Sequence, residues 1–420
     1  MFTTWGALIG LAIAIIFIIR KAAPAYALVL GALAGGLVGG GTLSETVSAM
    51  ISGTQSMMPS VLRILTSGIL AGALVKTGSA ERIADSIVRM LGSRFALAAI
   101  ALAAMIVTSV GVFVDIAVIT VAPVALAVGC RANIPVAALL LAMVGGGKAG
   151  NVISPNPNTI AAADAFKVDL TDLMMKNIVP ALCAFVVTIL ISAWLAKRIR
   201  SNCQTEESVS ICENNMKNLP NLFASIVGPV VVVMLLALRP ICGIAVDPLI
   251  ALPAGGIVSI IVCGRWKKTA EYCEFGLSKV VGVSILLIGT GAVAGIVKNS
   301  GLNSDMISVL NACHLPAFAL APLSSVLLSG ATASTTAGVT IASQTFSGAL
   351  AEAGIPALSA AAMLHAGGTI FDALPHGSFF HATAGAVGMS VKDRLKLFPY
   401  GTLVGATSTV VSVIVYLFGF

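Results

Sequence analysis

The sequence predicts an all-α polytopic membrane protein with two inverted repeats, broken helices or re-entrant hairpins, and about ten to twelve crossings. First, 58% of its 420 residues are hydrophobic and only 10% are charged, which is too few charges for a soluble surface. Second, one pattern occurs twice, at residues 134–158 and 355–378: Ile-Pro, an apolar run, clustered glycines and a polar break with proline. Backbone that leaves the helix at bilayer depth must be buried in protein or line a watery cavity, so paired breaks point to a transporter's binding site.

The two halves are predicted to be duplicated and inverted. A Val-Lys pair recurs after 222 residues, at Lys76 and Lys298, and the two Ile-Pro pairs lie 221 residues apart. Basic clusters in the short loops are expected to face the cytoplasm. With that orientation, residues 62–76 and 281–298 run in opposite directions across the membrane, and both termini lie outside.

The chain is predicted to form one integral membrane unit. Residues 1–19 are apolar from the start and have no basic leader region, so we expect a first span and not a removed signal. The expected layout is 1–60 as N-terminal accessory spans, 61–200 as repeat 1, 201–218 as a polar cytoplasmic linker, 219–280 as connecting spans and 281–420 as repeat 2.

Two further segments at matching places, residues 107–128 and 329–350, are predicted to be helix–break–helix arms. The N-terminus of a half-helix carries partial positive charge and free N–H groups, which suit a carboxylate. The second arm is dense in small and hydroxylated residues, among them Ser334, Thr335 and Thr336. Close helix packing by small residues explains such a run equally well.

Ionisable residues inside apolar segments are costly and usually functional. Asp115 has no charged neighbour in sequence, and Asp372 precedes His376 by four residues at the second break, so we expect these three to handle a proton. His365 and His381 are weaker candidates. Lys148 follows the glycine triplet at the first break, where it could attract an anion or pair with Asp115 or Asp164.

Neutral groups at the breaks can hold hydroxyls and a carboxylate without a buried net charge. The complete set of expected substrate-binding residues is Lys148, Asn151, Ser154, Asn156, Asn158, Thr159, Ser334, Thr335, Thr336, Gly367 and Gly368.

Several other functions are excluded or disfavoured. The chain contains no H-E-x-x-H, no G-x-S-x-G and no phosphate-binding loop, so we expect neither an enzyme nor an ATP-driven pump. Asp372 and His376 alone are too few ligands for a metal site, and we expect no cofactor. The net charge of +7 is scattered over short loops, which argues against nucleic-acid binding.

Three stretches carry a resemblance to a known family: VFVDIAVITVAPVAL at 112–126, SPNPNTIAAADAF at 154–166 and GGTIFDALPHGSFFHA at 367–382. In their order and spacing they resemble the gluconate:proton symporter (GntP) family of the ion transporter superfamily. The D-x-L-P-H portion is more similar to the hydroxybutyrate-permease-type branch. In one departure, Asn156 lies between the two prolines, where sugar-acid members tend to have a histidine.

The resemblance implies a bacterial inner-membrane symporter that imports a small hydroxylated monocarboxylate, gluconate-like or 3-hydroxybutyrate-like, together with a proton. It also implies re-entrant hairpins and a homodimer that moves by an elevator mechanism. The partners expected are therefore the small organic anion, the lipid bilayer and a second copy of the chain. A sodium-coupled organic anion carrier is the alternative, and an ion channel is the third hypothesis.

Overall fold

The computed structural model describes residues 2–20, 22–92, 95–199, 219–244, 246–302, 316–375 and 377–419, together with 305, 308 and 312. The expected linker at 201–218 lies outside this part. In the described chain the regular elements are helices, joined by one isolated bridge between Phe2 and Ser300. The all-α class is therefore confirmed.

The helices fall into two series separated by the region 199–221. The first series is α1 Thr4–Ile19, α2 Pro24–Val38, α3 Leu43–Gln55, α4 Met58–Lys76, α5 Ser79–Leu91, α6 Ala96–Ser109, α7 Val114–Arg131, α8 Val136–Asn151, α9 Pro157–Phe166, α10 Leu170–Lys176 and α11 Ile178–Arg198. The second is α13 Leu222–Cys242, α14 Pro248–Val262, α15 Thr269–Lys298, α17 Leu320–Thr332, α18 Thr335–Glu352, α19 Ala357–Gly367, α20 Ser378–Ala386 and α21 Val391–Leu417.

Both predicted arms are broken helices, and the local chemistry explains each break. Between α6 and α7 the chain passes through Gly111 at φ +106°, a conformation that only glycine adopts without strain. Between α17 and α18 it turns at Ala333, and the Ser334 side chain then accepts a hydrogen bond from the backbone N–H of Ala337. Ala333 in the left-handed conformation ends α17, and Ser334 as the N-cap starts α18.

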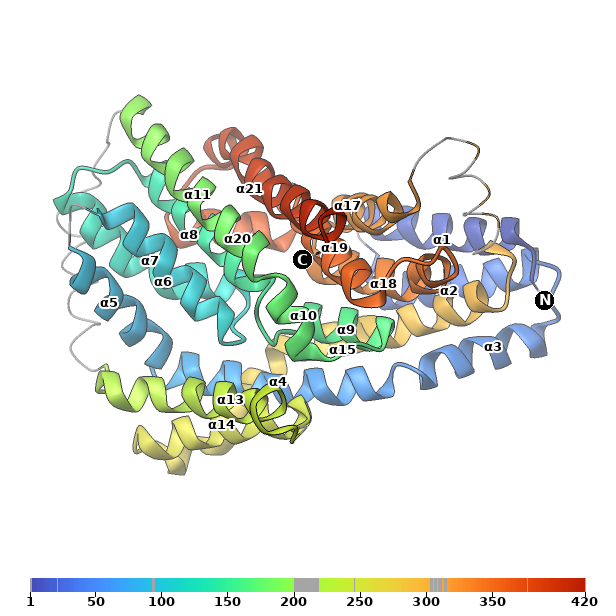
Figure 1. The fold of residues 1–420 in the computed structure, drawn as a ribbon, viewed down its shortest axis with the longest axis horizontal. Coiled ribbons are helices and arrows are strands. Elements are labelled where there is room, and N and C mark those ends of the chain that lie inside the picture. The colour runs from blue at the N-terminus through green and yellow to red at the C-terminus, as the bar shows by residue number, and fades with distance from the viewer. Residues whose placement is uncertain are drawn as a thin grey trace.

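The inverted repeat is visible in how α4 meets α15 (Figure 1). Gly68 lies against the backbone of Gly276, and Gly72 lies against the backbones of Gly276 and Tyr272. Along this contact the residue number increases on α4 in the direction in which it decreases on α15, so the two helices run antiparallel. The predicted opposition of residues 62–76 and 281–298 is thus confirmed.

The remaining helices pack in equivalent ways in the two series. The pair α1–α2 packs on α15 as the pair α13–α14 packs on α4. Helix α8 packs on α6 and α7, as α19 packs on α17 and α18. Across the series, α9 contacts α18, and the equivalent pair α20 and α7 is also in contact.

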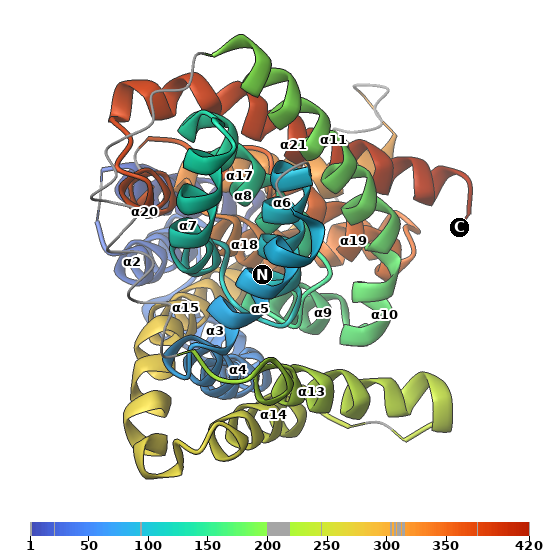
Figure 2. The same cartoon turned by 90° about the vertical axis from the view of Figure 1, so that its left-hand side faces the viewer.

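Two groups of helices result, which we name the framework (α1–α4 and α13–α15) and the inner group (α6–α11 and α17–α21). Most helix packing lies within one group, and the boundary between them is crossed chiefly by α15 against α18 and α4 against α9. Figure 2 shows α3, α4, α13 and α14 gathered below the inner group, and α5 joins the two. The cavities described below lie along this boundary.

The outer surface suits a bilayer. Helices α4, α7, α11, α15 and α21 are long and apolar enough to cross a membrane, and the described chain adds shorter apolar helices, including α8 and α19. On α11 a stripe of Leu182, Val186 and Leu190 is at least half exposed, at 50%, 52% and 63%. Large apolar side chains exposed every fourth residue along a helix are expected where lipid covers them.

Candidate functional site

A cavity of about 580 Å³ lies at the boundary, between α15 and the loop before α2 on one side and the inner group on the other. Four of the inner-group stretches that line it lie where helices begin: residues 113–116 at α7, Asn158 in the first turn of α9, residues 334–337 at α18 and residues 378–379 at α20. Residues 332–333, where α17 ends, Asn151 and Asp372 also line it. The cavity therefore faces four helix N-termini, two from each series, where partial positive charge favours an anion.

Seven of the expected site residues line this one cavity, although they come from distant parts of the chain. They are Asp115, Asn151, Asn158, Ser334, Thr335, Thr336 and Asp372. We expected the two predicted arms and the two polar breaks each to contribute residues to the site. In the fold, residues from both line the same cavity.

Lys148 lies behind the cavity wall and is only 2% exposed. Its Nζ forms an ion pair with Asp372 Oδ1 at 2.6 Å and donates to the carbonyls of Thr369 at 2.7 Å and Gly401 at 3.2 Å. The expected pairing with Asp115 or Asp164 is wrong, because helix α8 continues three residues past Lys148 and carries its side chain toward the second break.

Asp372 connects this ion pair to the cavity. Its Oδ2 accepts a hydrogen bond of 2.8 Å from the hydroxyl of Thr335, in the first turn of α18. Both carboxylate oxygens are thus engaged, and Asp372 is only 4% exposed. Lys148 therefore contacts Asp372, which lines the cavity, while Lys148 itself lies outside the lining.

The asparagines of the first break form a buried network. Asn156 caps α9, because its Oδ1 accepts from the backbone N–H groups of Asn158 and Thr159 at 2.8 and 3.1 Å. Asn151 Oδ1 accepts from Asn156 Nδ2 at 2.6 Å and from Asn158 Nδ2 at 3.2 Å. Asn158 Oδ1, however, has no partner in the described structure, although the residue is 4% exposed and lines the cavity.

Asp115 and Lys279 bring opposite charges to the cavity from different groups. Asp115, in the first turn of α7, accepts a backbone hydrogen bond at Ile116 and forms no ion pair in the described chain. Lys279 reaches the cavity from α15 and interacts with Asp115 at longer range. Lys279 was missed, although its position in LSKVVGV, between apolar runs, is a signal of the kind used for Asp115.

Other expected residues lie outside the cavity lining. Ser154 is fully buried, and Gly367 and Gly368 pack α19 against Pro322 of α17 and Val339 of α18. These glycines allow close helix approach, as the glycines of α8 do beside α6. Thr159 Oγ1 donates to the Asn156 side chain.

The two candidate histidines that the structure describes lie in different environments. His365 is fully buried in α19, and neither ring nitrogen has a partner in the described structure. His381 is exposed, with Nε2 2.8 Å from the carbonyl oxygen of Pro375. His376 lies outside the described residues.

An ionic cluster that the sequence did not reveal crosses the boundary near the end of α9. Arg63 of α4 pairs with Asp164 of α9 and, at 2.6 Å, with Asp247, which caps α14. Ser60 also donates to Asp164 at 2.5 Å. Arg63 therefore ties the framework to the inner group.

Similarity to known protein families shows to which family the chain belongs. A family model described as GntP family permease matches residues 3–419. The chain belongs to the GntP permease family. It is therefore a multi-pass membrane transporter, and the resemblance of its motifs to the GntP family is confirmed, while the likeness to the hydroxybutyrate-permease-type branch stays a prediction.

Relatives of this GntP permease cover most of its length. An uncharacterized transporter of Haemophilus influenzae is 51% identical over 413 residues, covering 98% of this chain and 97% of the relative. The gluconate permease of Zymomonas mobilis is 22% identical over 342 residues, or 76% of each chain. A high-affinity gluconate transporter of Escherichia coli is 23% identical over 357 residues, covering 79% of this chain and 81% of the relative.

A solved structure shares the fold. The YdaH transporter of Alcanivorax borkumensis, whose crystal structure is described as having an unusual topology, superposes with a TM-score of 0.69 at 17% identity. The match covers 90% of this chain and 89% of that one. At this identity the likeness concerns the fold alone.

Proposed function

We propose that this permease imports a small hydroxylated monocarboxylate into the bacterial cell by proton symport across the inner membrane. The observation that carries the proposal is the cavity lined by four helix N-termini and by Lys279. The partial positive charge of the helix N-termini and a nearby ammonium together favour a single carboxylate. Two relatives whose names specify gluconate support this class of substrate.

The cavity wall also favours a hydroxylated substrate. Asn158 Oδ1 is a buried acceptor without a donor in the described structure, and an unmet acceptor costs free energy until a ligand supplies a hydrogen. A substrate hydroxyl can donate to it, whereas a carboxylate cannot. Thr336 offers a further hydroxyl from α18.

We assign the coupled proton to Asp115. Its carboxylate shares the cavity with the substrate and has no ion-pair partner in the described chain, whereas Asp372 is neutralised by Lys148. An ionised Asp115 would repel an incoming carboxylate, and protonation would remove that repulsion. Proton and substrate would then bind together, which is what symport requires.

Uptake into proteoliposomes tests the proposal. Gluconate, 3-hydroxybutyrate and glycerate are offered in turn, under an inward proton gradient and then under an inward sodium gradient. Proton-driven uptake of one acid is expected, with Asp115→Asn uncoupling or abolishing it and Glu352→Gln, an exposed carboxylate outside the cavity lining, leaving it unchanged.

Two results would revise the proposal. Sodium-driven uptake would favour the sodium-coupled alternative, for which the free oxygen of Asn158 is a candidate ligand. Uptake of none of the three acids would discard the substrate class.

A further inference from the structure

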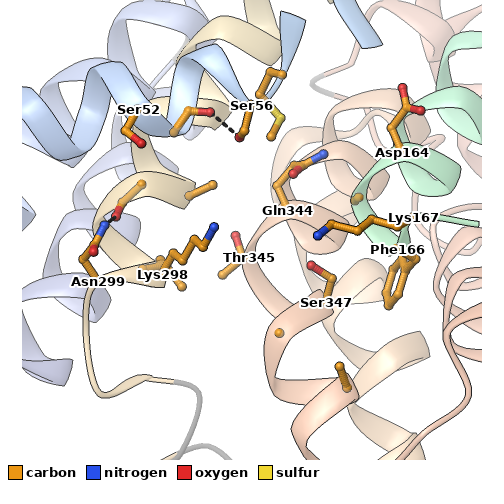
Figure 3. A pocket seen from close by; sticks show the side chains of 18 of the residues that line it. Ser52, Ser56, Asp164, Phe166, Lys167, Lys298, Asn299, Gln344, Thr345 and Ser347 are labelled. Carbon is orange, nitrogen blue, oxygen red and sulfur yellow. Dashed lines mark hydrogen bonds between the residues drawn. The ribbon is translucent and has the colours of Figure 1, made fainter. Parts of the chain in front are cut away.

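A second cavity, of about 460 Å³, lies at another place on the boundary (Figure 3). It is lined by α3 and α15 of the framework and by α9, α18 and the start of α19 in the inner group. It shares no lining residue with the first cavity. On α15 the two linings are residues 294–299 and 279–286, and the eight-residue step from Leu286 to Ala294 corresponds to about 12 Å of helix.

The second cavity has an excess of positive charge. Lys298, at the end of α15, and Lys167, at the end of α9, point into it from opposite sides (Figure 3). Neither lysine forms an ion pair within the described chain. The acid that lines this cavity, Asp164, is already engaged by Arg63 and Ser60.

Buried polar groups without partners face the same space. Thr345, on α18, is 2% exposed, and its Oγ1 has no hydrogen-bond partner in the described structure. The adjacent Gln344 has an Nε2 that is buried and equally without a partner. Both residues line the cavity, and a buried donor left unpaired costs about 1–3 kcal/mol, which a bound acceptor would offset.

We propose that this second cavity binds a small carboxylate anion, held between the ammonium groups of Lys167 and Lys298 and accepting hydrogen bonds from Thr345 and Gln344. The identity of the anion as the transported acid rests on the proposed function; the existence of the site does not. Because Lys298 belongs to the framework and Lys167 to the inner group, a bound anion bridges the two groups.

A cysteine probe tests the site without relying on transport. Ser347 lines the cavity and is labelled in Figure 3, so Ser347→Cys is treated with sulfonatoethyl (anionic) and trimethylammonioethyl (cationic) methanethiosulfonates in nanodiscs. Mass spectrometry of the peptide that contains position 347 separates its labelling from that of native cysteines. At about 0.15 M salt we expect the anionic reagent to be favoured by about fivefold or more.

The decisive measurement is protection by ligand. Millimolar gluconate or 3-hydroxybutyrate should slow labelling at position 347. Lys167→Gln and Lys298→Gln, each in the Ser347→Cys background, should reduce both the anion preference and the protection. Lys392→Gln, an exposed lysine outside the cavity lining, should change neither.

The outcomes separate this proposal from the proposed function. No protection by either acid, or protection that persists after both lysines are replaced, would overturn the second site. Lysine-dependent protection in a protein that transports neither acid would keep the second site and discard the proposed function. Asn158→Ala, which alters the first cavity, should leave protection at position 347 intact.

Discussion

Replacing Lys148 by methionine tests how Asp372 is held at the cavity. The substitution keeps an unbranched apolar stem of similar length but removes the ammonium group, which pairs with the carboxylate at 2.6 Å and donates to the carbonyls of Thr369 and Gly401. The carboxylate is then left buried, with the hydroxyl of Thr335 as its hydrogen-bond partner and the buried guanidinium of Arg394 as a more distant opposite charge.

The burial of the pair sets the magnitude. The side chains of Lys148 and Asp372 are 2% and 6% exposed, so the pair is largely shielded from solvent. Removing one member of a buried ion pair costs about 3–5 kcal/mol, because an uncompensated charge remains, whereas replacing both members by apolar groups is often close to neutral. The double variant Lys148→Met/Asp372→Leu should therefore be more stable than Lys148→Met alone.

Unfolding in mixed micelles, measured for wild type, both single variants and the double variant, gives the coupling energy. We expect about 2–3 kcal/mol of coupling. Additive effects of the two substitutions, or a Lys148→Met variant as stable as wild type, would refute the reasoning.

Three further predictions concern packing, capping and the ionic cluster. Gly276→Ala should destabilise the fold by about 1–3 kcal/mol, because its Cβ would collide with the carbonyl of Gly68 on α4; Gly282→Ala, with open space around it, should be neutral or stabilising. Asn156→Ala should cost about 1–2 kcal/mol by removing the α9 cap, and Asn156→Ser, which keeps a neutral side-chain acceptor, should recover part of it. Arg63→Gln should destabilise more than Asp164→Asn, because it leaves two carboxylates without their cation.

Thermal unfolding of the purified variants checks all three. Equal stability of the two alanine variants of α15 would contradict the packing argument. If Asn156→Ser proved no more stable than Asn156→Ala, the side-chain acceptor would not be what caps α9. A larger loss from Asp164→Asn than from Arg63→Gln would mean that the cluster is dominated by Ser60 and not by the cation.

The helix breaks could be predicted because their causes are local. Gly111, Ser334 and the proline–asparagine run around Asn156 stop or start helices through backbone chemistry that the sequence displays directly. The inversion of the halves could also be predicted, because the offset between the repeats and the placement of basic loops together constrain direction.

The pairing of charges could not be predicted, because it depends on which helices meet. Lys148 donates to the carbonyl of Thr369, which lies 221 residues further along the chain, the same offset that separates the two Ile-Pro pairs. Equivalent positions of the two repeats therefore touch, and the two breaks lie against one another. Arg63 reaches Asp164 and Asp247 only because α4, α9 and α14 converge, which no spacing along the chain reveals.

The glycine contacts of α15 have a mechanical consequence. Backbone meets backbone at Gly53 against Gly291 and Gly295, and again at Gly72 against Gly276, near the two ends of the same 30-residue helix. Surfaces so close have no side chains that could change rotamer to absorb a displacement. The helices α3, α4 and α15 would therefore stay fixed relative to one another. Any change that opens a binding cavity to the other side of the membrane would have to come from movement of other helices relative to these three.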